Sequence, residues 1–336
     1  MSQVQITIAN FTKQAKAEFH QLYAHRLKTA VSTLGDGVVA EVDSTFYKEV
    51  YPGFKAVSLP KQYKEGELDY DPIGDFNHEA ENRLYGGGLM IGRTKFEDLG
   101  NSPASLAALR QKIASQGTAA LSKKDNDFFD AIASLNDYSG TGNELLCYDG
   151  FPLFSTSHPN ASNLDAKSST GWDIATLRSE IISAQAAWAK FKDPDGKDYI
   201  MTASNLRRNT TMVVNVDAYI HVVEVMKAMY LPRFTGNSDF SDSGGSTENV
   251  LRKEFNVVVT ETPRIADTVI YMFNRDNGGN TPILWQNRVQ PQVEVEGEGS
   301  SGFFEQEVYK YKVRFRGVYL IRAFENAYAI TGKAAA

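Results

Sequence analysis

The pattern of apolar and polar positions opens with an amphipathic helix near the start of the chain. After a short strand-like stretch at residues 4–8, Asn10 is suited to cap the first turn of a helix. Apolar side chains then recur at three- and four-residue steps on one face, while the other face is mostly basic. The stripe consists of Phe11, Ala15, Phe19, Leu22, Leu27, Ala30 and Val31. We expect it to pack either on its own domain or on a neighbouring copy; in the second case Phe11, Phe19 and Leu22 are the predicted subunit contacts.

A much longer helix is predicted in the middle of the chain. Asn101-Ser102-Pro103 combines a capping side chain with a proline at the first helical position. An apolar stripe then runs through 104–138, which at about 1.5 Å per residue gives a rod of roughly 50 Å. Gly117 lies inside this rod, where a bend is possible. A second helix is predicted from about Gly171, with apolar residues at 3-4-3-4-3 spacing: Ile174, Leu177, Ile181, Ala184, Trp188 and Phe191.

Strand patterns lie on either side of these helices. Residues 38–98 contain aromatic and β-branched residues between prolines, around an acidic centre of Glu65, Glu67, Asp69, Asp71, Asp75, Glu79 and Glu81. Few positions there are apolar enough to form a core, so we expect an extended hairpin that projects from the body. Near the C-terminus, apolar and basic residues alternate, which predicts a strand with two different faces. The apolar face consists of Tyr309, Tyr311, Val313 and Phe315, and the basic face of Lys310, Lys312, Arg314 and Arg316.

The region between the second helix and this strand predicts a further unit of mixed structure. We expect a strand at 212–216, a helix at 217–230, a polar loop at 235–247 and strands at 255–261 and 269–273. The apolar tail at 319–330 continues as strand. The predicted fold class is therefore α+β.

Composition narrows the class of protein. The 336 residues carry a net charge of −6, which argues against a surface built to grip a nucleic-acid backbone. Cys147 is the single cysteine, so an intramolecular disulfide framework and a cysteine-based zinc site are excluded, and folding in a reducing cytoplasm is favoured. We expect no signal peptide and no membrane span, because no apolar stretch approaches the roughly 20 residues that a span requires.

Three sequence features could carry chemistry, and each has a simpler structural explanation. Cys147, Asp149 and His158 lie close together and allow a Cys/His nucleophilic pair. A turn in which Asp and His cap backbone groups is the favoured interpretation. The glycine run 86–88 lacks the lysine of a phosphate loop, and Asp193-Pro194-Asp195-Gly196 lacks the glutamate of a calcium loop. We therefore predict no catalytic residue, no metal site and no cofactor.

The order of elements resembles the Hong Kong 97 (Johnson) fold of the major capsid proteins of tailed bacteriophages. The segment 147–159, in which Asp149-Gly150 precedes His158-Pro159, looks like a turn of Mu-like major head subunits. Similar features are Arg93 with Phe96-Glu97-Asp98 before the long helix, and Lys192–Lys197 after Trp188, whereas Leu99 departs from the acidic residue usual in Mu-like heads.

The resemblance implies both a domain layout and a function. The implied layout is an N-terminal arm at 1–40, an extended loop (E-loop) with flanking strands at 41–100, a spine helix with a peripheral subdomain at 101–170, an axial subdomain at 171–290 and peripheral return strands at 291–336. The implied function is self-assembly into hexamers and pentamers that form an icosahedral shell around packaged double-stranded DNA. The chain would then be made in the host bacterial cytoplasm and reside in the virion, with scaffold, portal and decoration proteins as candidate further partners.

The charge pattern adds a hypothesis about how copies meet. Glu65, Glu67, Asp69 and Asp71 on the acidic loop of one subunit are predicted to face Lys310, Lys312, Arg314 and Arg316 of its neighbour. The alternative is that the basic residues pair within the subunit or face DNA. Rival functions are an encapsulin-like compartment shell, a tail-tube protein, and an enzyme that uses Cys147 and His158.

Overall fold

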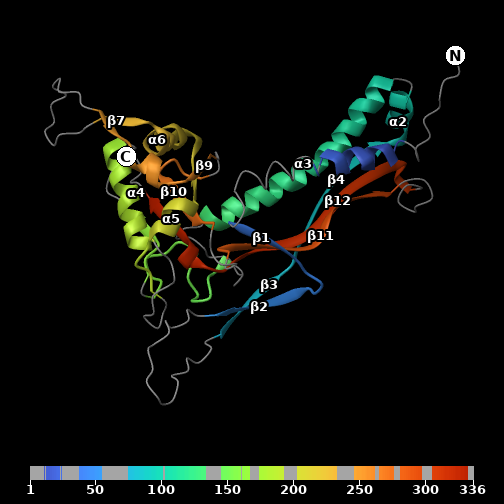
Figure 1. The fold of residues 1–336 in the computed structure, drawn as a ribbon. Helices are drawn as coiled ribbons and strands as arrows, with labels where there is room; N and C mark the ends of the chain where they lie inside the picture. Colours follow the sequence, from blue (N-terminus) through green and yellow to red (C-terminus); the bar gives the residue numbers. More distant parts are fainter. Residues whose placement is uncertain are drawn as a thin grey trace, which may run out of the picture.

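The computed structural model describes most of the chain as two joined bodies of mixed helix and sheet, which confirms the predicted α+β class (Figure 1). The described residues are 11, 13–22, 24, 38–54, 75–100, 103–133, 145–159, 161–166, 174–192, 203–232, 246–261, 265–275, 281–296 and 305–331. The predictions for Leu27, for residues 65–71 and for positions 235–245 of the predicted loop at 235–247 therefore fall outside the described residues, whereas residues 246 and 247 form part of a strand.

The first body is built on a four-stranded sheet in the order β1-β11-β12-β4. Its strands are β1 (Val39–Asp43), β11 (Ile283–Glu296), β12 (Val308–Ile321) and β4 (Arg83–Gly92). The predicted alternation along β12 is confirmed, because Tyr309, Tyr311, Val313 and Phe315 are buried while the basic residues between them reach solvent. The register between β11 and β12 shifts on both sides of Val289, and Pro291, which cannot donate to the ladder, lies in this irregular stretch.

The inner face of this sheet is covered by the spine helix α3 (Pro103–Ala133) and the N-terminal helix. Phe128 of α3 packs against Tyr319 with the ring centroids 5.6 Å apart, and Ile113 shares a cluster with Tyr309 and Tyr311. The predicted long helix is thus confirmed as one continuous helix of 31 residues. It passes through Gly117 without interruption. A Cβ at Gly117 would lie 3.1 Å from the Phe19 ring, so the glycine permits a close helix contact there.

The outer face of the sheet carries a hairpin of β2 (Lys48–Phe54) and β3 (Asp75–Glu81). Ala80 is fully buried against Leu284, Val318 and Leu320, which point away from the spine helix. The hairpin and the spine helix therefore lie on opposite faces of the sheet (Figure 1). The outer-face residues Val318 and Leu320 are covered by the hairpin, whereas the basic part of β12 lies beyond it.

The second body contains a five-stranded sheet in the order β5-β13-β10-β6-β9, flanked by helices α4 and α6. The predicted stripe on α4 (Ile174–Trp188) is confirmed, because Leu177, Ile181, Ala184 and Trp188 are fully buried. Asn215 caps α6 (Val216–Lys227) by accepting a hydrogen bond from the Asp217 amide at 3.0 Å. The remaining elements are α2 (Arg93–Gly100), β5 (Leu164–Ala166), α5 (Ala203–Asn209), β6 (Thr210–Val214), β7 (Tyr230–Pro232), β8 (Ser246–Glu248), α7 (Val250–Glu254), β9 (Val258–Glu261), β10 (Val269–Asn274), η2 (Phe324–Asn326) and β13 (Ala327–Thr331).

The final strand differs from the predicted layout. The boundary predicted at 291 placed all of 291–336 with the first body, but β13 pairs antiparallel with β10 and parallel with β5 in the second sheet. The chain crosses between the bodies after β12, at η2. Trp188 of α4 fixes this crossing by donating a hydrogen bond from its indole to the Glu325 carbonyl at 2.7 Å. The return of the chain thus joins the two bodies.

Candidate functional site

The basic column of β12 (Lys310, Lys312, Arg314 and Arg316) reaches solvent, and three of its four charges have partners in the same chain. Arg314 donates from Nε to Glu294 Oε1 at 2.7 Å, and Lys310 Nζ lies 3.7 Å from Glu296. Both acidic residues come from the neighbouring strand β11. The Arg316 guanidinium lies over the Tyr47 ring at 5.6 Å from its centroid. The alternative of pairing within the subunit is therefore realised for Lys310 and Arg314, and the exposed side chains leave room for further partners.

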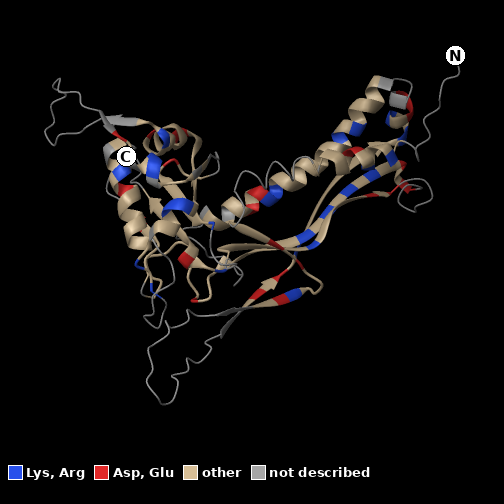
Figure 2. Ribbon diagram, viewed as in Figure 1, with Lys and Arg blue, Asp and Glu red and all other residues tan. Residues whose placement is uncertain are grey.

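Beside this column runs a row of small and apolar residues on β4. The β4–β12 register sets Met90, Gly88, Gly86 and Leu84 opposite Lys310, Lys312, Arg314 and Arg316. Met90 and Leu84 are 69% and 65% exposed, and they flank Gly86 and Gly88 in the same row. We call the surface formed by this row of β4 and the basic column of β12 the outer distal face. Figure 2 shows how Lys and Arg follow β12 while Asp and Glu gather on the β2–β3 hairpin.

The acidic partners predicted for this face are only partly described. Glu65, Glu67, Asp69 and Asp71 fall outside the described residues. On β3, Glu79 pairs with Lys48 across the hairpin and Glu81 accepts a hydrogen bond from the Tyr47 hydroxyl. Contact between the loop 65–71 and the outer distal face therefore stays a prediction.

The N-terminal stripe lies inside the subunit. Phe11 and Phe19 are fully buried within the single chain, and Leu22 packs against the same core. Phe11 meets Phe96 edge to face at 5.2 Å, beside Ile91 and Tyr309. The assignment of Phe11 and Phe19 to a subunit contact is corrected here, because Phe11 packs among α2, the spine helix and β12, and Phe19 packs on the spine helix at Gly117. The other interpretation, packing on the chain's own domain, is the one that the structure shows.

The Cys147–His158 segment is a buried turn held by side-chain hydrogen bonds. His158 Nδ1 lies 2.6 Å from Asp149 Oδ2, and its ring stacks on Phe324 with centroids 4.0 Å apart. Asp149 also accepts a hydrogen bond from the Phe151 amide at 3.2 Å. Burial, together with the carboxylates of Asp149 and Glu325, raises the pKa of the Cys147 thiol well above its usual value. A buried thiol with a raised pKa is a poor nucleophile, so the turn is a structural element that secures η2.

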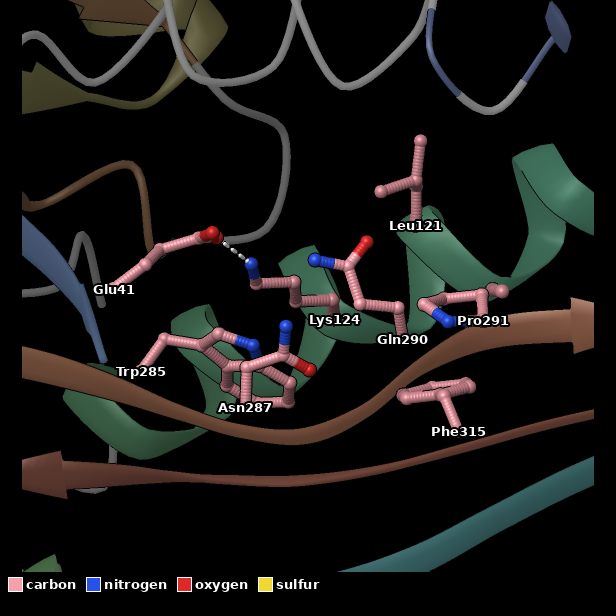
Figure 3. A pocket seen from close by; sticks show the side chains of 9 residues that line it. Glu41, Leu121, Lys124, Trp285, Asn287, Gln290, Pro291 and Phe315 are labelled. Atoms are coloured by element: carbon pink, nitrogen blue, oxygen red, sulfur yellow. Dashed lines mark hydrogen bonds and ion pairs between the residues drawn. The ribbon is translucent and has the colours of Figure 1, made fainter. Parts of the chain in front are cut away.

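A small pocket that the sequence did not indicate lies between α3 and the irregular part of β11 (Figure 3). Its unfilled space is about 350 Å³, part of it open to solvent. Lys124 reaches across it to form an ion pair with Glu41 and lies over the Trp285 ring at 4.7 Å from the centroid. Burial lowers the pKa of the Lys124 amine, and the Glu41 carboxylate opposes this effect. The pair joins β1 to the spine helix.

The sequence did not indicate the residues that hold the base of the β2–β3 hairpin. We call this base, formed by the β1–β2 turn and by Asn82, the hairpin root. Glu49 Oε1 accepts hydrogen bonds from the Ser44 hydroxyl and from the amides of Thr45 and Phe46, each at 3.0 Å. Asn82 is separated from Ser44 by 38 positions, so no local pattern could pair them. Leu84 and Met90 could have been found, because they alternate with glycines at strand spacing.

Within the described residues, no helix combines the length and apolar character that crossing a membrane requires. No curated protein matches the chain. Among solved structures, the chain is similar to the mature capsid of bacteriophage PhiM1, with 10% identity, a TM-score of 0.53 and coverage of 89% of this chain and 87% of that one. The capsid of cyanophage P-SCSP1u gives 11% identity and the same TM-score of 0.53, over 89% and 86% of the two chains.

A virus-like particle from Pyrococcus furiosus is similar over 95% of this chain and 98% of its own, with 8% identity and a TM-score of 0.50. At such identities these likenesses concern the fold, and they confirm the Hong Kong 97-like fold that the resemblance implied. The narrower likeness to Mu-like heads stays a prediction. A model of the family described as phage capsid protein matches residues 93–330. Because this match spans well over half of the chain, the protein belongs to the phage capsid protein family and is a shell subunit of the virion.

Proposed function

We propose that this major capsid protein assembles with its own copies into hexamers and pentamers that close an icosahedral shell around double-stranded DNA. The observation that carries this proposal is the placement of the exposed large apolar side chains. Among the described residues they occur on both bodies: Val42, Phe46, Tyr47, Val50, Leu84 and Met90 on the strands and the β1–β2 turn of the first body, and Ile182, Val216, Ile220 and Met229 on or beside α4 and α6 of the second.

Two separate apolar surfaces on one chain favour head-to-tail contacts between copies. A contact of this type joins different surfaces of two subunits, and it produces rings where the rotation closes. The α6 surface is notable because the helix already buries Ala218, Val222 and Val225 on its other side. A helix that is apolar on two faces needs a second covering partner. We propose that this partner is the axial subdomain of a neighbouring copy. This is the unit predicted at 171–290, except that its residues from Ile283 onward belong to β11 in the sheet of the first body.

The outer distal face supplies the second contact in this proposal. The E-loop of a neighbour would lie across it, with Glu65, Glu67, Asp69 and Asp71 toward Lys310, Lys312, Arg314 and Arg316. Because exposed ion pairs contribute only about 0–1 kcal/mol each, the charges would set register and association rate while apolar burial supplies affinity. Scaffold, portal and decoration proteins are the further partners proposed, and the host bacterial cytoplasm is the proposed place of synthesis.

Electron microscopy of the purified full-length chain tests the proposal. We expect hollow shells of uniform size with pentamers and hexamers in the reconstruction, and nucleic acid inside particles that assemble during infection. A chain that stays monomeric at high concentration would contradict the proposal.

Particles that enclose an enzyme in place of DNA would favour an encapsulin-like compartment. The family match to phage capsid proteins gives that alternative less support. We also propose that the chain works without catalysis, and an activity lost in Cys147→Ala would contradict this.

A further inference from the structure

The hairpin root is the place where the chain leaves the sheet of the first body and returns to it. It consists of the β1–β2 turn, Ser44–Tyr47, and of Asn82 between β3 and β4. Beyond the root, seven residue pairs from Lys48–Glu81 to Phe54–Asp75 join β2 to β3. The paired part is therefore stiff, and the root fixes the direction in which it leaves the sheet.

Two side chains close the root from opposite strands. Asn82 donates from Nδ2 to the Ser44 hydroxyl at 3.0 Å and to the Phe46 carbonyl at 2.9 Å, and its own amide donates to the Tyr47 carbonyl at 3.0 Å. The Ser44 hydroxyl in turn donates to Glu49, which also holds two amides of the turn. Asn82 is 3% exposed, so water does not replace these bonds readily.

The closed root is anchored to the sheet at two further points. The Ser44 amide donates to the Asn287 carbonyl of β11 at 2.9 Å. Farther along the hairpin, the Tyr51 hydroxyl donates to Gln286 Oε1 at 2.8 Å. A turn that served only to reverse the chain would need neither a buried carboxamide nor contacts to a third strand. The arrangement resists rotation of the hairpin about its root.

From this geometry we infer that Asn82 and Glu49 are positioning residues that set the direction of the β2–β3 hairpin before a neighbouring copy binds. The inference rests on the proposed function, in which the loop carried by this hairpin lies across the neighbour. A preset direction lowers the conformational entropy that is lost when subunits associate. We call the hydrogen bonds made by Asn82 and Glu49 at the root the clamp. Loss of the clamp would leave the fold intact and would let the hairpin depart from this single direction.

The test measures the direction of the hairpin in the full-length chain. Spin labels on Glu79→Cys of β3 and Lys112→Cys of α3, both at exposed positions, report the distance between the hairpin and the body by pulsed electron resonance. The native background is expected to give one narrow distribution. Asn82→Ala and Glu49→Ala are expected to broaden it and to abolish uniform shells, while their circular dichroism stays native.

Matched variants separate the clamp from general damage. Glu49→Gln keeps the accepting oxygen and is expected to restore both the narrow distribution and the shells. Lys48→Ala, which removes an exposed charge from the same hairpin and whose partner Glu79 is already substituted in the labelled chain, is expected to change neither readout. Ser44→Ala gives a milder opening of the clamp if Asn82→Ala does not fold. A narrow distribution in the alanine variants, or normal shells despite a broad one, overturns the inference.

The two proposals fail in different ways. If the unsubstituted chain forms no shells, self-assembly fails as its function, and the distance distributions still decide whether the clamp sets the direction. If every variant forms shells equally well, self-assembly stands and the positioning role fails.

Discussion

At the scale of single residues, Gly317 shows how closely the first body is packed. A Cβ at this position would lie 2.5 Å from the Trp285 ring and 2.6 Å from the Gln286 carbonyl oxygen. Both atoms belong to the paired strand β11, so neither can move without disturbing the sheet. We expect Gly317→Ala to lower the free energy of unfolding by about 1–3 kcal/mol, measured by urea denaturation. Gly87→Ala is the control, because its Cβ would meet nothing within 4 Å, and an equal loss there would contradict the argument.

Tyr51 gives a prediction about alkaline pH. Burial, with the Glu49 carboxylate nearby, raises the pKa of the Tyr51 hydroxyl from 10.0 to about 12. The unfolded chain therefore loses this proton first, and the stability that Tyr51 contributes is complete below pH 10 and declines as the pH rises toward 12. We expect Tyr51→Phe to be less stable than the native chain at pH 8, because it lacks the bond to Gln286, and to lose less stability between pH 9 and pH 11. Parallel pH profiles in urea unfolding would contradict this.

At the scale of elements, the N-terminal helix is part of the core of its own subunit. The Phe19 ring lies against Gly117 of the spine helix, where a Cβ would approach it to 3.1 Å. We expect Phe19→Ala to cost about 3–5 kcal/mol of unfolding free energy and to increase hydrogen exchange in residues 13–22. Gln21→Ala, at an exposed position, is the control and should change neither quantity. An effect of Phe19→Ala on assembly alone, with unfolding unchanged, would restore the interpretation of a contact between subunits.

The elements that the sequence predicted well are those in which apolar residues recur at a single helix or strand period and all pack against the same core. The stripe of α4 and the alternation of β12 are of this kind. The strand β11 was missed, because the polar run Gln286–Gln292 and Pro291 resemble a loop, and only pairing with β12 makes it a strand. β13 was assigned to the wrong sheet, since its partners β10 and β5 are chosen by long-range packing that no local pattern contains. The same holds for the root, where Asn82 and Ser44 meet across 38 positions.

At the scale of the whole molecule, the basic residues of the outer distal face have two sets of acidic partners to consider, those of their own subunit and those of a neighbouring subunit. Arg314 is engaged by Glu294 of its own chain, so reversing its charge disturbs an internal pair as well as any external one. We expect Arg314→Glu with Arg316→Glu to slow shell assembly, measured by light scattering. The defect should shrink at high salt, because a Debye length of about 3 Å at 1 M screens the repulsion between like charges.

Two compensating sets of substitutions then separate the causes. Adding Glu294→Lys restores the internal pair alone, and we expect it to leave assembly slow. Adding Glu67→Lys and Asp69→Lys restores only the external complement, and we expect a partial recovery of rate, because several weak pairs act mainly on register and encounter. Recovery with Glu294→Lys and none with the loop substitutions would assign the basic column to the stability of its own sheet. The loop of one subunit would then contact the exposed apolar residues of its neighbour's outer distal face. Leu84 and Met90 on β4 are the remaining anchors there, because both are exposed.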